Sequence, residues 1–136
     1  MLRYMLDTNI CIYVIKNRPE GLRERFNRLA DQLCISAVTL SEIIYGAEKS
    51  ARQIENIKVV EQFAARLDVL PFGERAATHY GQIRADLERA GHPIGLHDMM
   101  IGGHARSEGL TLVSNNLREF QRIEGLRVDN WVYEQR

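Results

Sequence analysis

The sequence predicts a three-layer α/β/α sandwich with a mainly parallel central sheet, and three observations support this fold class. Short apolar stretches alternate with amphipathic helical stretches along the chain. The apolar stretches lack the polar alternation of half-exposed strands, which is typical of strands buried on both faces. No repeat or low-complexity linker interrupts the pattern, and 136 residues with 45% hydrophobic content can fill one core. We therefore expect one domain over residues 1–136.

The first half of the chain alternates between buried strands and helices with one apolar face. Asp7, Thr8 and Asn9 all suit a helix N-cap, so a strand is expected to end there and a helix to follow. The next helix has two candidate caps, because Ser36 and Thr39 both precede an apolar stripe with helical spacing. We expect strands at 3–6, 33–35 and 69–70, and helices at 10–16, between Pro19 and Leu33, from Ser36 or Thr39 to Ala47, and at 54–67.

The second half of the chain contains two helices separated by a clear break. Apolar spacing predicts a helix over 74–90, and the glycines and proline of Gly91–Gly95 end it. The next helix is expected to open near Asp98 and to end at Gly109. Because its residues are mostly apolar and small, it should be central and tightly packed. A strongly buried strand at 110–113 follows it.

Composition excludes several classes of protein. No stretch approaches the roughly 18 consecutive apolar residues of a membrane span, and the first residues lack the order of a signal peptide, so a cytoplasmic protein is expected. The two cysteines have no CxxC spacing and are expected to be buried and reduced. The histidines show no zinc-like spacing, and His97 and His104 are interpreted as surface or packing groups. The residues concerned are Cys11, Cys34, His79, His92, His97 and His104.

The net charge is an objection to a nucleic-acid enzyme. Eighteen basic and 18 acidic residues give a formal charge of zero, whereas contacts with phosphates favour a basic surface. A net charge of zero is compatible with a basic patch on the surface, because carboxylates gathered at one site would leave the remaining surface net basic. Arg23, Arg25 and Arg28 form one local basic cluster in the sequence.

Four carboxylates and one amide follow the expected strands. Asp7 follows the first strand, Glu42 lies in the first turn of the helix after the second, and Asp98 opens the glycine-rich helix. Ligands of open α/β sheets bind outside the carboxyl ends of the strands, where these positions converge. Carboxylates in one cleft repel each other unless a divalent cation neutralises them, so a cation is the inferred cofactor. Asn116 and Glu119, after the last expected strand, complete the set.

Each of these carboxylates also has a plain structural interpretation. Asp7 would cap a helix, and Glu42 would complete a capping box with Thr39. Asp98 would favour a helix N-terminus, and Glu119 would be solvated surface. Acidic residues are enriched at helix starts in any protein, so no single position decides between the interpretations. The functional interpretation depends on their joint placement.

Four short motifs occur in order along the chain. Met5–Asn9 reads MLDTN, and Val38–Gly46 reads VTLSEIIYG. Gly95–Ala105 reads GLHDMMIGGHA, and Val113–Phe120 reads VSNNLREF. In order and spacing these segments resemble the motifs of PIN-domain ribonucleases, in particular the VapC-type toxins of type II toxin–antitoxin systems. A single D-T-N would be weak evidence, whereas the four together extend the resemblance over nearly the whole chain.

The resemblance implies a catalytic centre built from carboxylates. Asp7 and Asp98 correspond to the main metal ligands, and Glu42 and Glu119 to further residues of the same acidic pocket. With Mg²⁺, or alternatively Mn²⁺, bound there, a water would be oriented for in-line attack on an RNA phosphodiester. Glu42 is the candidate to take the proton, and hydrolysis would leave a 5′-phosphate and a 3′-hydroxyl.

Four neighbouring positions would support this centre. The resemblance implies that Thr8 and Asn9 shape the pocket. Two positions depart from the family pattern, because Asn116 stands where many members have Asp and Ser114 stands where Thr is common. The fourth acidic position would therefore contribute through Glu119 alone, which leaves a second metal site open.

The resemblance also implies partners. A VapB-like antitoxin would wrap the toxin with its C-terminal segment and place a basic side chain in the acidic pocket. Toxin homodimers and toxin–antitoxin hetero-oligomers are typical of the family, and no membrane association is expected. The RNA substrate is expected to be a tRNA, with the anticodon stem-loop of initiator tRNA as the candidate target.

Two other interpretations remain open from the residues alone. A phosphate-transfer or receiver-like α/β domain could also place an Asp after its first strand, although the chain contains neither a D-x-D motif nor a P-loop. A catalytically weak RNA-binding module could keep the fold without the activity. RNA degradation that needs Mg²⁺ and stops with chelator would distinguish the enzyme from both.

Overall fold

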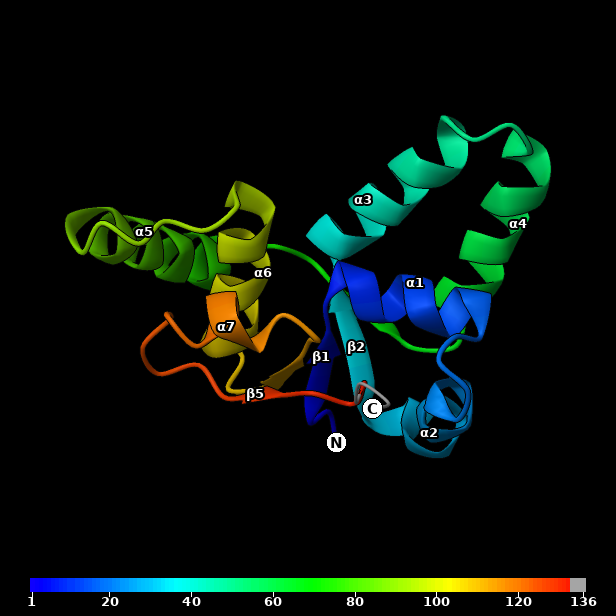
Figure 1. Ribbon diagram of the computed structural model, residues 1–136, viewed down its shortest axis with the longest axis horizontal. Helices are drawn as coiled ribbons and strands as arrows, with labels where there is room; N and C mark the ends of the chain where they lie inside the picture. Colours follow the sequence, from blue (N-terminus) through cyan, green and yellow to red (C-terminus); the bar gives the residue numbers. More distant parts are fainter. Residues whose placement is uncertain (133–136) are drawn as a thin grey trace.

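The computed structural model describes residues 1–132, and within them five strands form one parallel sheet (Figure 1). The strand order is β3-β2-β1-β4-β5, and each neighbouring pair runs in the same direction. β1 is therefore the central strand, and the expected parallel sheet is confirmed. The strands are β1 (Tyr4–Leu6), β2 (Leu33–Ser36), β3 (Asp68–Leu70), β4 (Thr111–Val113) and β5 (Val128–Asp129).

The connecting segments are mainly helical. Two short C-terminal elements, a helix at Leu117–Phe120 and the strand β5, were not predicted. The helix before β2 ends at Leu29, earlier than its apolar spacing suggested. None of the helices in the described part of the chain is long and apolar enough to cross a membrane. The helices are α1 (Thr8–Lys16), α2 (Leu22–Leu29), a 3₁₀ turn η1 (Ala30–Gln32), α3 (Ala37–Glu48), α4 (Gln53–Ala64), α5 (Glu74–Arg89), α6 (Leu96–Ser107) and α7 (Leu117–Phe120).

Helices cover both faces of the sheet and make the predicted three layers. Side chains alternate along a strand, so neighbours on β1 enter different cores. Leu6 packs with residues of α1 to α4, whereas Met5 packs with residues of α5, α6 and α7. On β2, Ile35 packs in the same core as Leu6, and Cys34 packs in the same core as Met5. Figure 1 shows α1, α3 and α4 on one side of the strands and α5, α6 and α7 on the other.

The strand order creates a switch point between β1 and β4. The chain passes from β1 to β2 and β3 on one side, and then adds β4 and β5 on the other side of β1. The backbone N–H of Asp7 donates to the carbonyl of Val113 at 3.0 Å, so the carboxyl ends of β1 and β4 lie side by side. Open parallel sheets bind ligands at such a point. Polar residues that follow β1 and β4 are therefore brought together.

Helix α3 begins earlier than a capping box at Thr39 would require. The hydroxyl of Ser36 accepts a hydrogen bond from the N–H of Val38 at 3.1 Å, so Ser36 is the N-cap. Thr39 lies in the first turn, and its buried hydroxyl has no hydrogen-bond partner among residues 1–132. Glu42 consequently lies in the second turn of α3. Its expected place in the first turn is wrong, and so is its plain role in a capping box.

Helix α6 approaches its neighbours closely because two consecutive glycines lie at the contacts. A Cβ at Gly103 would lie 2.9 Å from the backbone nitrogen of Tyr80 on α5. A Cβ at Gly102 would lie 2.6 Å from the Cδ1 atom of Ile123. A side chain at Gly103 would overpack the contact with the backbone of α5, whereas one at Gly102 would require the end of the Ile123 side chain to move. The prediction of a central, tightly packed helix is confirmed, and this packing holds the helix that carries Asp98.

The cysteines and one histidine belong to the cores. Cys11 and Cys34 are buried free thiols, as predicted, and burial raises the pKa of Cys34 to about 12. His104 is fully buried, and its Nδ1 atom lies 2.8 Å from the hydroxyl of Ser36. Burial lowers the pKa of His104. This histidine is therefore a neutral packing group, which agrees with the sequence-based interpretation.

Two arginines of α2 are used within the fold. Arg23 donates to the carbonyls of Val14 at 3.0 Å and Ile15 at 2.6 Å, at the end of α1 where carbonyls lack helical partners. The guanidinium of Arg25 lies 4.5 Å from the ring centre of Trp131. Two of the three arginines of the basic cluster therefore have contacts within the fold.

Candidate active site

Asp7 joins β1 to α1 and combines two roles that the sequence presented as alternatives. Its Oδ1 atom accepts the N–H of Ile10 at 2.9 Å, so the side chain caps α1. The residue is also only 3% exposed and follows the central strand at the switch point. Because Oδ1 makes the capping bond, Oδ2 is left for other contacts. The structural role and a role in chemistry are compatible at this residue.

The surroundings of Asp7 oppose its negative charge. Burial raises its pKa from 3.8 to about 6, and the like charges of Asp98 and Glu42 act in the same direction. The nearby side chain of Ser114 and the hydrogen bond from the N–H of Ile10 partly offset this rise. Ser114 is fully buried at the end of β4. A carboxylate in these surroundings would be stabilised by a nearby positive charge.

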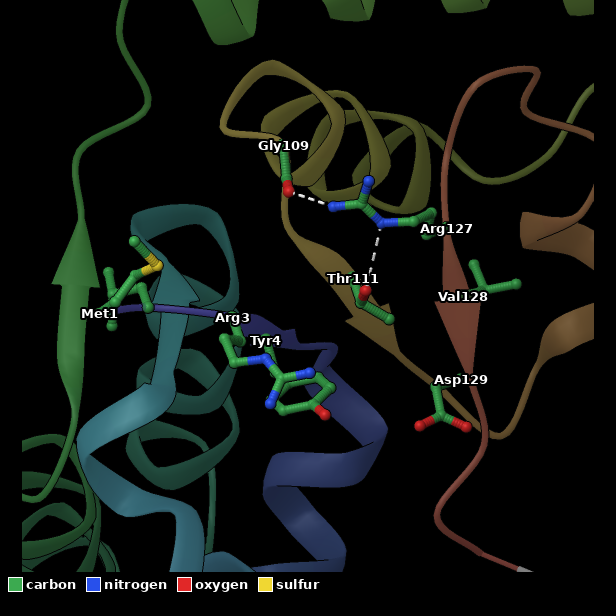
Figure 2. Close-up of a pocket in the computed structure, with 9 residues that line it drawn as sticks. Met1, Arg3, Tyr4, Gly109, Thr111, Arg127, Val128 and Asp129 are labelled. Atoms are coloured by element: carbon green, nitrogen blue, oxygen red, sulfur yellow. Dashed lines mark hydrogen bonds between the residues drawn. The ribbon is translucent and has the colours of Figure 1, made fainter.

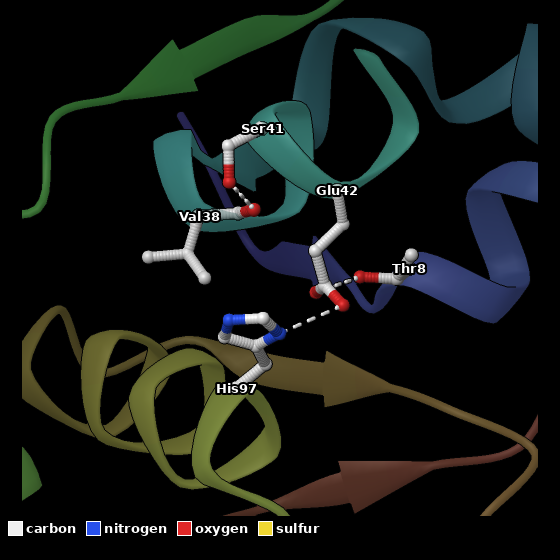
Figure 3. Close-up of polar contacts among 5 residues, drawn as sticks. All are labelled: Thr8, Val38, Ser41, Glu42 and His97. Carbon is white, nitrogen blue, oxygen red and sulfur yellow. Dashed lines mark hydrogen bonds and ion pairs between the residues drawn. The ribbon is translucent and has the colours of Figure 1, made fainter. Parts of the chain in front are cut away.

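Glu42 is held at both of its carboxylate oxygens (Figure 3). The hydroxyl of Thr8 donates to Oε1 at 2.8 Å, and the Nδ1 atom of His97 lies 3.2 Å from Oε2. Thr8 begins α1, and His97 lies in the first turn of α6. Three helices therefore meet at the carboxylate of Glu42.

Asp98 and Glu119 bring two further negative charges to the same region. Asp98 lies in the first turn of α6 and Glu119 lies in α7, and both are partly buried. Burial raises the pKa of Asp98, the charges of Glu119 and Glu42 add to the rise, and His97 opposes it. The negative charge of Asp98 in turn raises the pKa of Asp7. The four carboxylates singled out in the sequence thus form one interacting group, called the acidic group below.

The acidic group is not a preformed metal cage. Among residues 1–132, no three His, Cys, Asp or Glu side chains are arranged to surround an ion. In the same part of the chain, no Lys or Arg forms an ion pair with any of the four carboxylates. Within residues 1–132 the group therefore has no Lys or Arg partner, and its one contact with a basic side chain is that of His97 with Glu42.

The remaining supporting positions lie around the acidic group in different ways. Asn9 is exposed on α1. Asn116 is the N-cap of α7 but makes no capping bond with its side chain, and its N–H donates to the hydroxyl of Ser114 at 2.8 Å. The neighbouring Asn115 donates to the hydroxyl of Tyr13 at 3.1 Å, which ties the loop after β4 to α1.

His97 is the residue of this region whose contact the sequence did not indicate. It had been interpreted as a surface or packing group, and its side chain is indeed 63% exposed. Its contact with Glu42 crosses 55 positions of sequence, so no local pattern could predict it. The available signal was its place directly before Asp98, in the first turn of the helix.

A separate cavity of about 760 Å³ lies at the opposite end of the strands (Figure 2). The starts of β1, β4 and β5 line it, and Arg3 and Arg127 are among its residues. Arg127 donates to the carbonyl of Gly109 and, at 3.5 Å, to the hydroxyl of Thr111. No member of the acidic group lines this cavity. It is therefore distinct from the candidate active site.

Both the sequence and the fold match known proteins. The PIN domain family matches residues 4–126. The chain is 58% identical over 131 residues to the "tRNA(fMet)-specific endonuclease VapC" of Shigella flexneri, with 96% of this chain and 99% of that protein covered. It is 54% identical over 132 residues to "Ribonuclease VapC2" of Haemophilus influenzae, with 97% and 100% covered. A crystal structure of DNA-bound VapBC from Salmonella typhimurium aligns with a TM-score of 0.93 at 57% identity, covering 97% of this chain and 100% of that one.

The matches decide between the interpretations of the fold. They cover nearly the whole chain, and the matched family includes all four segments that carried the resemblance. A phosphate-transfer or receiver-like domain is therefore set aside. The chain belongs to the PIN-domain family and, within it, to the VapC ribonucleases.

Proposed function

We propose that this protein is the toxin of a type II toxin–antitoxin pair and a cytoplasmic endoribonuclease whose target is initiator tRNA. The observation that carries the proposal is the acidic group at the switch point of the sheet, whose carboxylates have no Lys or Arg partner in residues 1–132. The choice of target is supported by the 58% identity to the tRNA(fMet)-specific endonuclease of Shigella flexneri.

Mg²⁺, or Mn²⁺ in its place, is the proposed cofactor, with Asp7 and Asp98 as its ligands. Carboxylate oxygens suit both ions. Mg²⁺ keeps several of its waters and is often held by one or two carboxylates together with substrate phosphates. It therefore does not require three protein ligands arranged around the ion, and no such arrangement occurs in residues 1–132. Burial and like charge raise the pKa of both ligands, so a cation would relieve a repulsion that is already present.

The proposed reaction is hydrolysis of a phosphodiester by water. When bound, the cation would supply an activated water and neutralise charge at the phosphate. Glu42 is the proposed proton acceptor, because its carboxylate is held in place at both oxygens. Asp7 is kept away from bulk water at the base of the group. Glu119 adds negative charge from the side of α7.

The activity can be tested with purified protein and initiator tRNA. We expect a single cut in the anticodon stem-loop with Mg²⁺, no cut with chelator, and restoration by added Mn²⁺. The downstream fragment should carry a 5′-phosphate, which ligation-based sequencing of RNA ends detects, and an elongator tRNA serves as the control. Absence of cleavage with both ions would favour the RNA-binding module, and cleavage that persists in chelator would disprove the metal dependence.

The proposed partner is a VapB-like antitoxin that assembles with a toxin homodimer. Solved VapBC complexes from Salmonella typhimurium and Rickettsia felis contain chains that align with this one at TM-scores of 0.93 and 0.90. An Arg or Lys of the antitoxin would pair with the acidic group, since charge-assisted bonds to carboxylates are strong. Neutralising every basic residue in the C-terminal segment of the antitoxin should abolish inhibition. Inhibition that survives this change would refute the proposed contact.

A further inference from the structure

The contact between His97 and Glu42 stands out because His97 is a largely exposed residue with a fixed partner (Figure 3). Its side chain is 63% exposed, whereas that of Glu42 is 26% exposed. Exposed side chains lose conformational entropy when they are held in one place, so they are usually free. His97 is nevertheless directed at the carboxylate of Glu42, with Nδ1 3.2 Å from Oε2.

The direction of this hydrogen bond follows from the chemistry of the two groups. An ionised carboxylate only accepts hydrogen bonds, so the Nδ1 atom of His97 must carry the proton. The hydrogen-bond partner of a histidine ring sets which ring nitrogen is protonated. The role of His97 is therefore that of a donor, and it requires an N–H at one defined position of the side chain.

The two contacts on Glu42 restrain different motions of its carboxylate. The bond from Thr8 anchors Oε1, but the carboxylate could still turn about that oxygen. The bond from His97 holds Oε2 and thereby fixes the plane of the group. Because His97 directly precedes Asp98 on α6, the contact also fixes Glu42 relative to the helix that carries a proposed metal ligand.

We propose that His97 is a positioning residue, which holds the carboxylate of Glu42 in the orientation that hydrolysis requires. The inference rests on the proposed function, since it assumes that Glu42 takes part in the reaction. His97 acts through its Nδ1–H on Glu42 and not on the RNA. The side chain at this position must therefore supply a donor, and neither the ring nor its bulk is required.

Two variants separate the donor from the ring. His97→Asn places an amide N–H at the position of Nδ1 but removes the ring, whereas His97→Phe keeps a ring without a donor. We expect His97→Asn to keep kcat within about twofold of the original, and His97→Phe to lower kcat about tenfold with KM unchanged. A packing role predicts the reverse order, because Phe fills the space of the ring better than Asn does. The reverse order would overturn the proposal.

A spectroscopic measurement tests the contact independently of cleavage. In ¹⁵N NMR spectra of the chelator-treated protein at alkaline pH, where the ring is neutral, His97 should carry its proton on Nδ1. Glu42→Ala should shift this proton to Nε2, because the acceptor is gone. A proton on Nε2 in the unaltered protein would overturn the proposal.

Asp98→Asn provides the reference that separates this inference from the proposed function. If Asp98→Asn still cleaves RNA at the original rate, the proposed nuclease site itself is wrong. If Asp98→Asn is inactive while His97→Phe keeps the full kcat, only the positioning role is refuted. Thermal unfolding of each variant shows whether it remains folded, and His97→Asn provides the folded control because it changes the same position.

Discussion

The two ends of the sheet differ in how their charged groups are paired. At the amino-terminal end, Arg127 bonds to Gly109 and Thr111 (Figure 2), and the guanidinium of Arg3 lies 5.3 Å from the ring centre of Tyr4. These charges have partners within the fold. At the carboxyl end, four carboxylates repel each other, and none pairs with Lys or Arg in residues 1–132.

The cavity and the acidic group, which is the proposed site of chemistry, therefore lie at opposite ends of the sheet. The amino-terminal end has a cavity of about 760 Å³, but its arginines already have partners. At the carboxyl end the pKa values of Asp7 and Asp98 are raised, and perturbed pKa values cluster at functional sites. Removing one charge should therefore have different consequences at the two ends.

The largest expected difference concerns turnover. Asp98→Asn removes one charge with little change of volume and should lower the rate of RNA cleavage about 1,000-fold, as loss of electrostatic stabilisation at a reaction centre does. Arg127→Gln removes one charge at the other end and should leave the rate within about twofold. Single-turnover cleavage of initiator tRNA measures both. Equal damage by the two changes would mean that both ends take part in the reaction.

The next effect concerns the pH dependence of stability without metal ions. The pKa of Asp7 in the folded protein, about 6, is above its usual 3.8, so folding strengthens proton binding. The stability that this adds is complete below 3.8 and is lost as pH rises through 6, by up to about 3 kcal/mol. Asp7→Asn keeps a cap acceptor but carries no charge. In chelator, this variant should be the more stable protein at neutral pH.

Denaturant unfolding of both proteins across this pH range measures the effect. The advantage of Asp7→Asn should shrink as the pH falls below 6 and vanish below 3.8, where the native carboxyl is also neutral. Comparing the two proteins removes the contributions of all other titrating groups, because these are shared. A constant difference at every pH would show that the charge of Asp7 is not responsible.

A smaller effect concerns the response of Asp98 to metal ions. Burial and the charges of Glu119 and Glu42 raise its pKa, so Asp98→Asn should raise the melting temperature in chelator by about 4 °C, equivalent to about 1 kcal/mol. Mg²⁺ should reverse the ranking, because it binds the folded original and stabilises it by mass action. A variant that is destabilised in chelator, with no response of the original to Mg²⁺, would disprove a shared acidic group.

The smallest effect is expected at the amino-terminal end. Arg127→Gln loses the hydrogen bonds to Gly109 and Thr111, and because Arg127 is exposed its unfolding free energy should fall by at most about 1 kcal/mol. Mg²⁺ should not alter this difference. A Mg²⁺-dependent change would connect the two ends of the sheet and remove the contrast between them.

Elements with a strong local pattern could be predicted from the sequence, and short elements could not. The helix over Glu74–Arg89 has a regular apolar spacing and a clear breaker after it, so its prediction at 74–90 is confirmed. Helix α7 and β5 are too short for any periodicity to appear. β5 depends instead on its neighbour, since Leu112 of β4 pairs with Val128. Such pairing is a property of the folded sheet.

The start of α3 was ambiguous for a similar reason. Ser36 and Thr39 have equivalent capping chemistry, and the choice depends on surroundings that the local sequence does not contain. Ser36 is fully buried beside His104, with a contact of 2.8 Å from a helix far along the chain. That contact holds the Ser36 hydroxyl where it can cap the helix. Local pattern identified the helix, and tertiary contact selected its first residue.

The acidic group was predictable because each member stands close to the end of a strand or the start of a helix. The order of strands then converts distant sequence positions into neighbours. The sequence could not show which carboxylate oxygens of the group already accept hydrogen bonds within the fold. The cap made by Asp7, and the bonds from Thr8 and His97 to Glu42, depend on side-chain directions that only the packed structure determines.

The capping bond of Asp7 has a genetic consequence. Asn keeps the cap acceptor at the same length, and in the genetic code it lies one nucleotide from Asp. Cells that survive forced expression of the toxin should therefore include Asp7→Asn mutants that still accumulate the full-length protein, as sequencing and immunoblots of survivors would reveal. Such a protein would keep three of the four carboxylates of the acidic group and the antitoxin-binding surface outside that group, and it would compete with active copies for the antitoxin. An inactive allele would then increase the fraction of active toxin that is free of antitoxin in the same cell.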